Sequence, residues 1–269
     1  MQIFFLGTGG SEGLPCPHCF CDHCREARKY PLFRRVPSAV LVLNARGEAL
    51  LVDAGTDVAE VCDGLNLQGV LLTHWHADHY AGLFRLGWSP HPLPLVSPEP
   101  GRGRKLLPKG LKERRGAPLK ALELGSFRIF PLSLKHTVPT WGYLVEDEEG
   151  HSVAFLWDTK GLPLETEAFL RRYRPHLAVV DATYPPEIQA ENHNNLREAA
   201  EIGLSLAHEV LLTHISHQNH SPFFLEEYLG RAFPQSPVAL AYDGLKHSLA
   251  YPLSLSLKEA EGSSLSGIP

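Results

Sequence analysis

The sequence lacks an export signal. The apolar stretch at residues 1–6 is cut short by Gly7-Thr8-Gly9-Gly10, and no basic residues precede it. A signal peptide needs a basic start and a longer apolar core, and a membrane-spanning helix needs about 20 apolar residues. We therefore expect a cytoplasmic protein with no membrane partner.

The sequence also lacks an excess of positive charge, because 25 Lys and Arg residues stand against 30 Asp and Glu residues and the net charge is -5 at pH 7. This balance excludes the class of proteins that coat nucleic acid through a general basic surface, but it leaves room for a local patch. The segment 97–120 carries eight Lys or Arg against two Glu, with its basic residues at 101–120. We interpret this segment as a solvated surface loop in preference to a basic lid over a substrate.

Cysteine is scarce, and four of the five cysteines lie between Cys16 and Cys24. In a reducing compartment such a cluster indicates a metal site and not disulfides. A closed structural zinc needs four ligands. The spacing allows four thiolates from Cys16, Cys19, Cys21 and Cys24, and it equally allows three of them with a fourth ligand from elsewhere in the chain.

The alternation of apolar strands and turns predicts a single domain. With 43% hydrophobic residues and no internal repeat, the chain can bury one large core. We expect this domain at residues 1–257, with a small Cys-rich insertion at 16–24 and a flexible Ser/Gly-rich tail at 258–269. Strands are predicted at 2–6, 38–43, 49–52, 69–72, 127–131, 143–146, 153–157, 177–180, 210–212 and 238–241, and helices at 57–63, 165–173, 195–207 and 222–233. This order suits an α/β sandwich.

The strongest chemical signal is the motif Thr-His-Trp-His-Ala-Asp-His at residues 73–79, directly after an apolar strand. In the loop that follows a strand, His74 and His76 can bind one metal while Asp78 and His79 turn toward a second. Imidazole and carboxylate ligands suit zinc, manganese or iron, and the absence of a thiolate argues against copper(I). Four such residues in six positions predict a two-metal centre.

The pattern His-x-His-x-Asp-His, with Asp53-Ala54-Gly55 upstream, resembles the metallo-β-lactamase superfamily. The resemblance implies an αββα sandwich with the metals at one edge of two facing sheets. It also implies three further ligands at strand ends, which are His136, a bridging Asp158 and His214. Asp53 is expected to orient a metal-bound histidine.

Within this superfamily the chain is similar to PhnP-like phosphodiesterases through most of its length. The similarity rests on the segments at 133–136, 141–144, 157–163, 181–186, 192–196, 212–218 and 242–244, whereas 90–125 matches little. The resemblance implies a small or cyclic phosphodiester as substrate. It also implies that Cys19, Cys21, Cys24 and His217 hold a structural zinc, the alternative being Cys16 in place of His217.

The expected reaction uses two divalent ions, zinc or manganese, and a hydroxide that bridges them as the nucleophile on phosphorus. His193 and Asp78 are the predicted catalytic residues. The resemblance implies that His193 protonates the leaving group. The alternative is a purely structural role, in which His193 caps the helix that follows.

Three alternatives remain from the sequence. A tRNase Z-type endonuclease shares the metal motif, and the basic segment could contact a nucleic-acid backbone, although nucleic acid is the less favoured substrate. A non-hydrolytic PqqB-like accessory protein of cofactor biosynthesis shares the cysteine cluster. A β-lactamase is disfavoured because that activity requires export. The resemblance also admits a homodimer.

Overall fold

The computed structural model describes residues 1–99, 104–105 and 107–249. The predicted tail at 258–269 and part of the basic segment, residues 101–103 and 106, lie outside this range. Within it the chain forms two mixed sheets, each with seven strands. The first sheet contains β1 (Gln2–Gly7), β2 (Ala39–Leu43), β3 (Glu48–Ala54), β4 (Asn66–Leu71), β5 (Leu93–Val96), β6 (Leu111–Glu113) and β14 (Lys246–Ser248). The second contains β7 (Leu122–Leu124), β8 (Phe127–Ser133), β9 (Trp141–Glu146), β10 (Ser152–Leu156), β11 (Leu177–Asp181), β12 (Glu209–Thr213) and β13 (Val238–Leu240).

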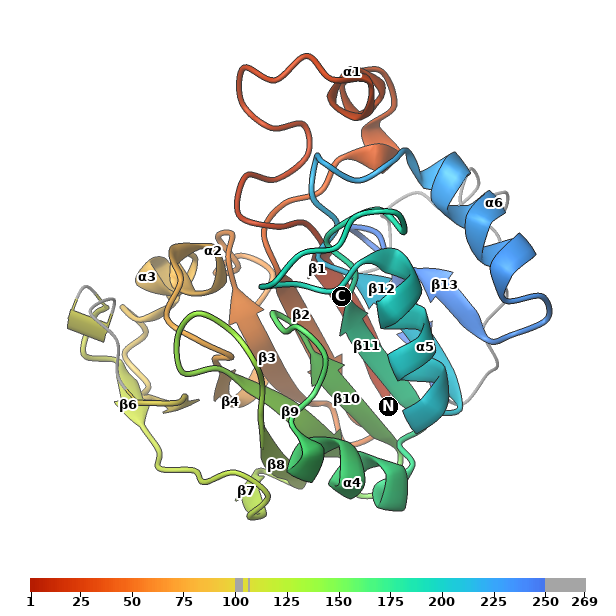
Figure 1. Ribbon diagram of the computed structural model, residues 1–269. Helices are drawn as coiled ribbons and strands as arrows, with labels where there is room; N and C mark the ends of the chain where they lie inside the picture. The colour runs from red at the N-terminus through yellow and green to blue at the C-terminus, as the bar shows by residue number, and fades with distance from the viewer. Residues whose placement is uncertain (100–103, 106, 250–269) are drawn as a thin grey trace.

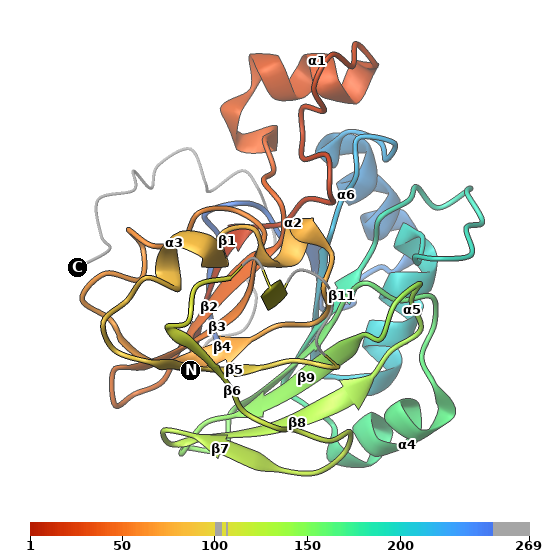
Figure 2. The ribbon, with the colours of Figure 1, turned by 90° about the vertical axis from the view of Figure 1, so that its left-hand side faces the viewer.

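Helices cover the outer faces of the two sheets, which pack on each other (Figures 1 and 2). The short helices α2 (Ala77–Tyr80) and α3 (Leu83–Leu86) lie on the first sheet. The second sheet is covered by α4 (Leu164–Tyr173), α5 (Leu196–Leu206) and α6 (Pro222–Ala232). The predicted αββα sandwich in a single domain is confirmed.

Alternating side chains on the strands separate three apolar cores. In β10, Val153 and Phe155 point between the two sheets, while Ala154 and Leu156 pack under the helices of the second sheet. In β3, Leu50 faces the central core and Leu51 faces α3. Successive side chains thus enter different cores, as the period of two in a strand requires. Because both faces of each sheet are buried, the central strands are continuously apolar.

The segment that carries the cysteines stands outside the sandwich. It contains α1 (Asp22–Lys29) and a 3-10 turn at Pro31–Phe33, and Figure 1 shows it projecting beside the start of α6. A small apolar cluster formed by Leu14, Cys24, Ala27 and Phe33 stabilises it. Among the described residues, no helix combines the length and apolarity that crossing a bilayer requires.

Two predictions of local structure are wrong. The predicted helix at 57–63 is absent, and residues 59–63 form turns. At its start the Asp57 side chain accepts a hydrogen bond from the Ala59 N–H at 3.0 Å, a local contact that competes with helical backbone bonds. The segment 97–120 is not wholly a loop, since it contains β6, which pairs with β5.

Candidate functional site

The predicted ligands of the two-metal centre lie at one edge of the sandwich, in segments that follow strand ends. We call them the His/Asp cluster, which consists of His74, His76, Asp78, His79, His136, Asp158 and His214. His74 and His76 come after β4, and His136, Asp158 and His214 come after β8, β10 and β12. The end of β4 is fixed from the other sheet, because the Tyr143 hydroxyl donates to the Leu72 carbonyl at 2.7 Å and lies 3.1 Å from the Val96 carbonyl. The two sheets therefore position one site together.

One group of donor atoms is formed by His74, His76, His136 and Asp158. His74 Nε2 lies 2.9 Å from His76 Nδ1, which lies 3.3 Å from His136 Nε2. Asp158 Oδ2 lies 3.7 Å from Nε2 of both His74 and His136. These atoms all lie within 4.8 Å of one another, so they can share one ion.

A second group is formed by Asp78, His79, Asp158 and His214. His79 Nε2 lies 3.2 Å from Asp78 Oδ2 and 3.4 Å from Asp158 Oδ2. Asp158 Oδ1 lies 3.1 Å from His214 Nε2. Asp158 belongs to both groups, which is the geometry expected of a bridging carboxylate.

The donor atoms fit a pair of divalent cations. His79 Nε2, His214 Nε2 and Asp158 Oδ1 are buried and lie close to one another, but none of them makes a hydrogen bond of acceptable geometry among the described residues. An unsatisfied buried polar atom costs about 1–3 kcal/mol, so three that converge on one point need a common partner. Imidazole and carboxylate ligands fit zinc or manganese. The buried cluster is therefore consistent with a dinuclear metal site.

The pKa directions in the cluster agree with a cationic occupant. Burial lowers the pKa of His74 well below its ordinary value, which keeps this ring in the neutral form that coordinates metals. Burial also disfavours the charge on His79, but Asp158 and Asp53 raise the pKa of His79 well above its ordinary value. The two carboxylates that favour a proton on His79 would equally favour a cation in its place.

Asp53, at the end of β3, orients His79 by contacting Nδ1, the ring nitrogen that is not part of the cluster. Its buried carboxylate accepts hydrogen bonds from the Thr73 N–H at 2.7 Å, the Thr73 hydroxyl at 2.7 Å and Trp157 Nε1 at 2.8 Å. His79 Nδ1 lies 2.7 Å from Asp53 Oδ2. These contacts leave His79 Nε2 for the cluster, and they support the interpretation that Asp53 positions a ligand. The following Gly55 is required here, because a Cβ at this position would lie 1.9 Å from the Asp78 carbonyl oxygen.

Asp181, at the end of β11, positions side chains in the second sheet as Asp53 does in the first. No role was predicted for Asp181 from the sequence. It accepts hydrogen bonds from the Thr159 N–H at 3.0 Å and the Thr183 hydroxyl at 2.6 Å. His193 Nδ1 lies 2.7 Å from Asp181 Oδ2, and the Thr183 hydroxyl lies 2.8 Å from His214 Nδ1. Asp181 therefore orients both His193 and His214. The sequence signal that could have identified Asp181 is its position at the end of a buried strand, which Asp53 shares.

His193 does not cap the following helix. Asn195 is the N-cap of α5, and with Glu198 it forms a reciprocal capping box. His193 instead stacks on His214, with ring centroids 5.1 Å apart and planes at 17°. Burial disfavours its charge, but Asp181 and the hydrogen bond to it raise the pKa of His193 to about 9.

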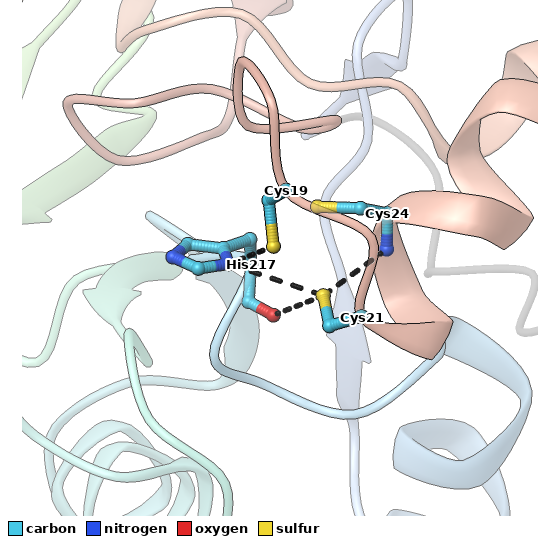
Figure 3. A group of neighbouring side chains, drawn as sticks. All are labelled: Cys19, Cys21, Cys24 and His217. Atoms are coloured by element: carbon cyan, nitrogen blue, oxygen red, sulfur yellow. Dashed lines mark hydrogen bonds between the residues drawn. The ribbon is translucent and has the colours of Figure 1, made fainter.

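The second cluster is formed by Cys19, Cys21, Cys24 and His217 (Figure 3). His217 Nδ1 lies 3.4 Å from Cys19 Sγ and 3.9 Å from Cys21 Sγ. Cys21 caps α1, and its sulfur lies 3.5 Å from the Cys24 N–H. Cys16 is not part of this group, and its thiol donates instead to the Pro17 carbonyl at 3.6 Å. Three sulfurs and one imidazole fit tetrahedral zinc, so this cluster could hold a metal.

A short loop after β1 contacts both clusters. The Ser11 hydroxyl donates to Asp78 Oδ2 at 2.7 Å. The next residue, Glu12, accepts a hydrogen bond from the His217 N–H at 3.1 Å through Oε1. The loop therefore links the Cys/His cluster to the His/Asp cluster. A cavity of about 110 Å³ opens beside this loop and is lined by Gly10, Ser11, Glu12, Thr183, Tyr184, His193, His214, Ser216 and Gln218.

The remaining histidines near these motifs have ordinary partners. His23 is buried with Nδ1 3.0 Å from the Asn219 carbonyl, and burial lowers its pKa to about 4. His220 Nε2 lies 2.6 Å from a Glu187 carboxylate oxygen. His247 is buried in β14. None of the three belongs to a ligand group among the described residues.

Comparisons with known proteins agree with this geometry. A family model described as a beta-lactamase superfamily domain matches residues 49–215, which contain the whole His/Asp cluster. An octanoyltransferase of Porphyromonas gingivalis is 27% identical over 91% of this chain and 51% of its own length. A ribonuclease Z of Pyrococcus abyssi is 26% identical over 64% of this chain and 56% of its own length, so the chain spans about half the length of these curated relatives.

Among solved structures, a diphosphatase from the PhnP family superposes with a TM-score of 0.74. It is 25% identical, and the match covers 92% of this chain and 97% of that chain. The similarity in structure therefore covers most of the chain, whereas the match to the family model is confined to residues 49–215.

Proposed function

Because the chain belongs to the metallo-β-lactamase superfamily and carries its buried His/Asp cluster, we propose that it hydrolyses a small or cyclic phosphodiester. The observation that carries this proposal is His193, which lies against His214 and also lines the cavity. A phosphodiester with an alkoxide leaving group needs a proton at the departing oxygen, and a histidine at this place can supply it.

Two divalent cations in the cluster, zinc or manganese, would supply Lewis-acid chemistry, because such ions lower the pKa of water and offset the charge that develops on phosphoryl oxygens. The seven side chains of the His/Asp cluster would hold these ions. Asp53 and Asp181 fix the ring orientations of His79 and His214 from outside the cluster. Ser11 fixes the carboxylate of Asp78. A structural zinc in the Cys/His cluster would keep the 10–12 loop in place.

His193 is well placed to give up a proton. Its Nδ1 is bound to Asp181, so Nε2 is the nitrogen left for the cavity. Burial disfavours the charge on His193, but Asp181 raises the pKa of the ring, which favours the protonated form that a proton donor needs. A leaving group in the cavity would therefore meet a protonated imidazole beside the metal ligands.

A tRNase Z-type endonuclease is the second candidate, favoured by the similarity to a ribonuclease Z. Of the basic segment, Lys109, Lys112, Arg114 and Arg115 are exposed and could contact a nucleic-acid backbone, whereas Arg104 is paired with Glu113 at 2.9 Å. The small cavity favours a small diester over a tRNA end.

Turnover by the metal-loaded protein separates these possibilities. We expect hydrolysis of a ribosyl cyclic phosphate and of bis-nitrophenyl phosphate, and no cleavage of precursor tRNA at its 3′ end. Metal-stripped protein is the control and should be inactive until zinc or manganese is restored. Cleavage of precursor tRNA with no turnover of small diesters would replace this proposal with the tRNase Z reading. No turnover of any diester would favour a PqqB-like accessory role.

A further inference from the structure

The cavity beside His193 has an unusual charge for a site that receives an anion. Its lining contains one carboxylate, from Glu12, and no Lys or Arg. The remaining polar groups are hydroxyls, an amide and imidazoles. The phosphoryl group itself would meet the metal ligands, so the cavity is left for the part of the substrate that lies beyond the phosphorus.

Glu12 points one carboxylate oxygen toward this space. Oε1 accepts the hydrogen bond from the His217 N–H at 3.1 Å. A Cβ added to Gly10 would lie 3.4 Å from the His214 ring and 3.6 Å from Glu12 Oε2, so this second oxygen is on the same side as the metal-ligand histidine. Among the described residues, Oε2 has no hydrogen-bond partner, so it is available to a ligand.

Two further groups in the lining are available in the same way. The Tyr184 hydroxyl and the Gln218 side-chain amide make no hydrogen bond to the described residues, although both residues border the cavity. By contrast, the Ser11 and Thr183 hydroxyls are engaged with Asp78 and Asp181. The free groups are thus one acceptor with a full negative charge and two neutral groups, a set that matches hydroxyls.

We propose that Glu12 selects a leaving group that carries hydroxyls and no second negative charge. This inference rests on the proposed phosphodiester hydrolysis. A hydroxyl can donate to Glu12 Oε2. A second phosphate would face this carboxylate with no Lys or Arg in the lining to offset it, since the proton of His193 is the one given to the departing oxygen. The cavity volume of about 110 Å³ suits a small polyol or sugar, because pockets for larger ligands are about 300–1,000 Å³.

The test compares two substrates that differ by one phosphate. A ribosyl cyclic phosphate is assayed with and without a phosphate on its primary hydroxyl, using the metal-loaded protein. We expect wild-type kcat/KM to favour the unphosphorylated compound by roughly tenfold or more. Glu12→Gln keeps an acceptor for the His217 N–H but removes the charge, so this preference should largely disappear. Raising the salt concentration should weaken the wild-type preference and leave that of the variant unchanged.

A matched control is Glu187→Gln, which makes the same charge change on a carboxylate that pairs with His220 outside the cavity. It should keep the wild-type preference. Metal content and melting temperature are measured for both variants, so that a damaged Cys/His cluster is recognised. Equal preference in wild type and Glu12→Gln would overturn the role of Glu12 and reduce it to support for His217.

Binding gives a readout that does not depend on turnover. The non-hydrolysable methylenephosphonate analogues of the two compounds are titrated calorimetrically into the metal-loaded wild type and Glu12→Gln. If neither diester is hydrolysed but wild type alone favours the unphosphorylated analogue, the proposed reaction is wrong and the selectivity of Glu12 stands. If neither analogue binds, or both bind equally to wild type, the selectivity is wrong.

Discussion

The His/Asp cluster and the Cys/His cluster are assembled in opposite ways. Ligands of the His/Asp cluster are spread from His74 to His214 and follow strand ends in both sheets. Three of the four ligands of the Cys/His cluster lie within residues 19–24, in a segment that projects from the sandwich (Figure 1). The His/Asp cluster can form only after the sheets have packed, whereas the Cys/His cluster ties a local segment to one distant residue.

The surroundings of the two clusters differ accordingly. Around the His/Asp cluster, buried Asp53 holds the ring of the ligand His79, and buried Asp181 holds the ring of the ligand His214 through the Thr183 hydroxyl. Around the Cys/His cluster the apolar core is small and Cys21 is exposed. The packed sheets position the residues of the His/Asp cluster. In contrast, a metal bound to the Cys/His cluster would itself stabilise part of the fold. Loss of a ligand should therefore cost activity in the His/Asp cluster and stability in the Cys/His cluster.

Asp158→Ala should show the largest effect on activity. The substitution removes the carboxylate shared by both ligand groups, and even outer partners of metal ligands are worth about 10–100-fold, so we expect a loss of about 10³-fold or more in kcat/KM. Elemental analysis should fall from two ions in this cluster toward one or none, with the zinc of the Cys/His cluster retained. Exposed Asp57→Ala serves as the control. Full activity in Asp158→Ala would refute the shared-ligand geometry.

His193→Ala should show the next largest effect, and only on some substrates. A general acid contributes about 10²–10⁴-fold when the leaving oxygen is basic, so the loss should reach about 10²-fold or more on an alkyl diester. Bis-nitrophenyl phosphate has a good leaving group and should lose far less. The ratio of the two losses is the measurement, at unchanged metal content. Equal losses on both substrates would remove His193 from proton transfer.

Asp53→Asn should give a smaller loss, of about 10–100-fold, because it weakens the orientation of His79 without removing a ligand. The backbone at Asp53 has φ +56°, a conformation that Asn tolerates, so this variant changes the charge without adding backbone strain. Metal affinity should fall together with activity. An unchanged metal affinity would mean that Asp53 supports the fold and does not tune the cluster.

Four ligands of the His/Asp cluster were predicted from the sequence directly, because they lie in one short motif. His136, Asp158 and His214 were predicted only through the resemblance to the superfamily, and the structure brings them together with the motif. The role of Asp181 was not predicted, because a single Asp at the end of an apolar strand does not by itself indicate a site. Its role depends on contacts to His193 and Thr183 that only the folded chain creates.

The less predictable parts of the fold share another cause. Strands β5, β6, β7 and β14 are three or four residues long, and β5 contains a proline, so they lack an apolar run long enough to detect. Helix α1 was missed because its N-terminal turn holds cysteines, which were interpreted only as ligands. The structure shows that Cys21 caps that helix as well. Tertiary contacts, and not local propensity, decide these elements.

Cys21→Ser should change activity least and stability most. Zinc binding adds directly to folding free energy, so weakening the Cys/His cluster should lower Tm by about 5–10 °C, which at roughly 2–4 °C per kcal/mol is a loss of a few kcal/mol. Activity per folded molecule should stay within about threefold, because Asp53 and Asp181 hold the His/Asp cluster directly, whereas the Cys/His cluster reaches it only through the 10–12 loop. Cys16→Ser is the matched control, since this sulfur lies outside the ligand group and the substitution should cost no more than about 0.5 kcal/mol. Thermal melts and initial rates on the same samples decide the outcome. If Cys21→Ser melts like Cys16→Ser yet loses its activity, the Cys/His cluster takes part in the reaction, and the contrast between the two clusters fails.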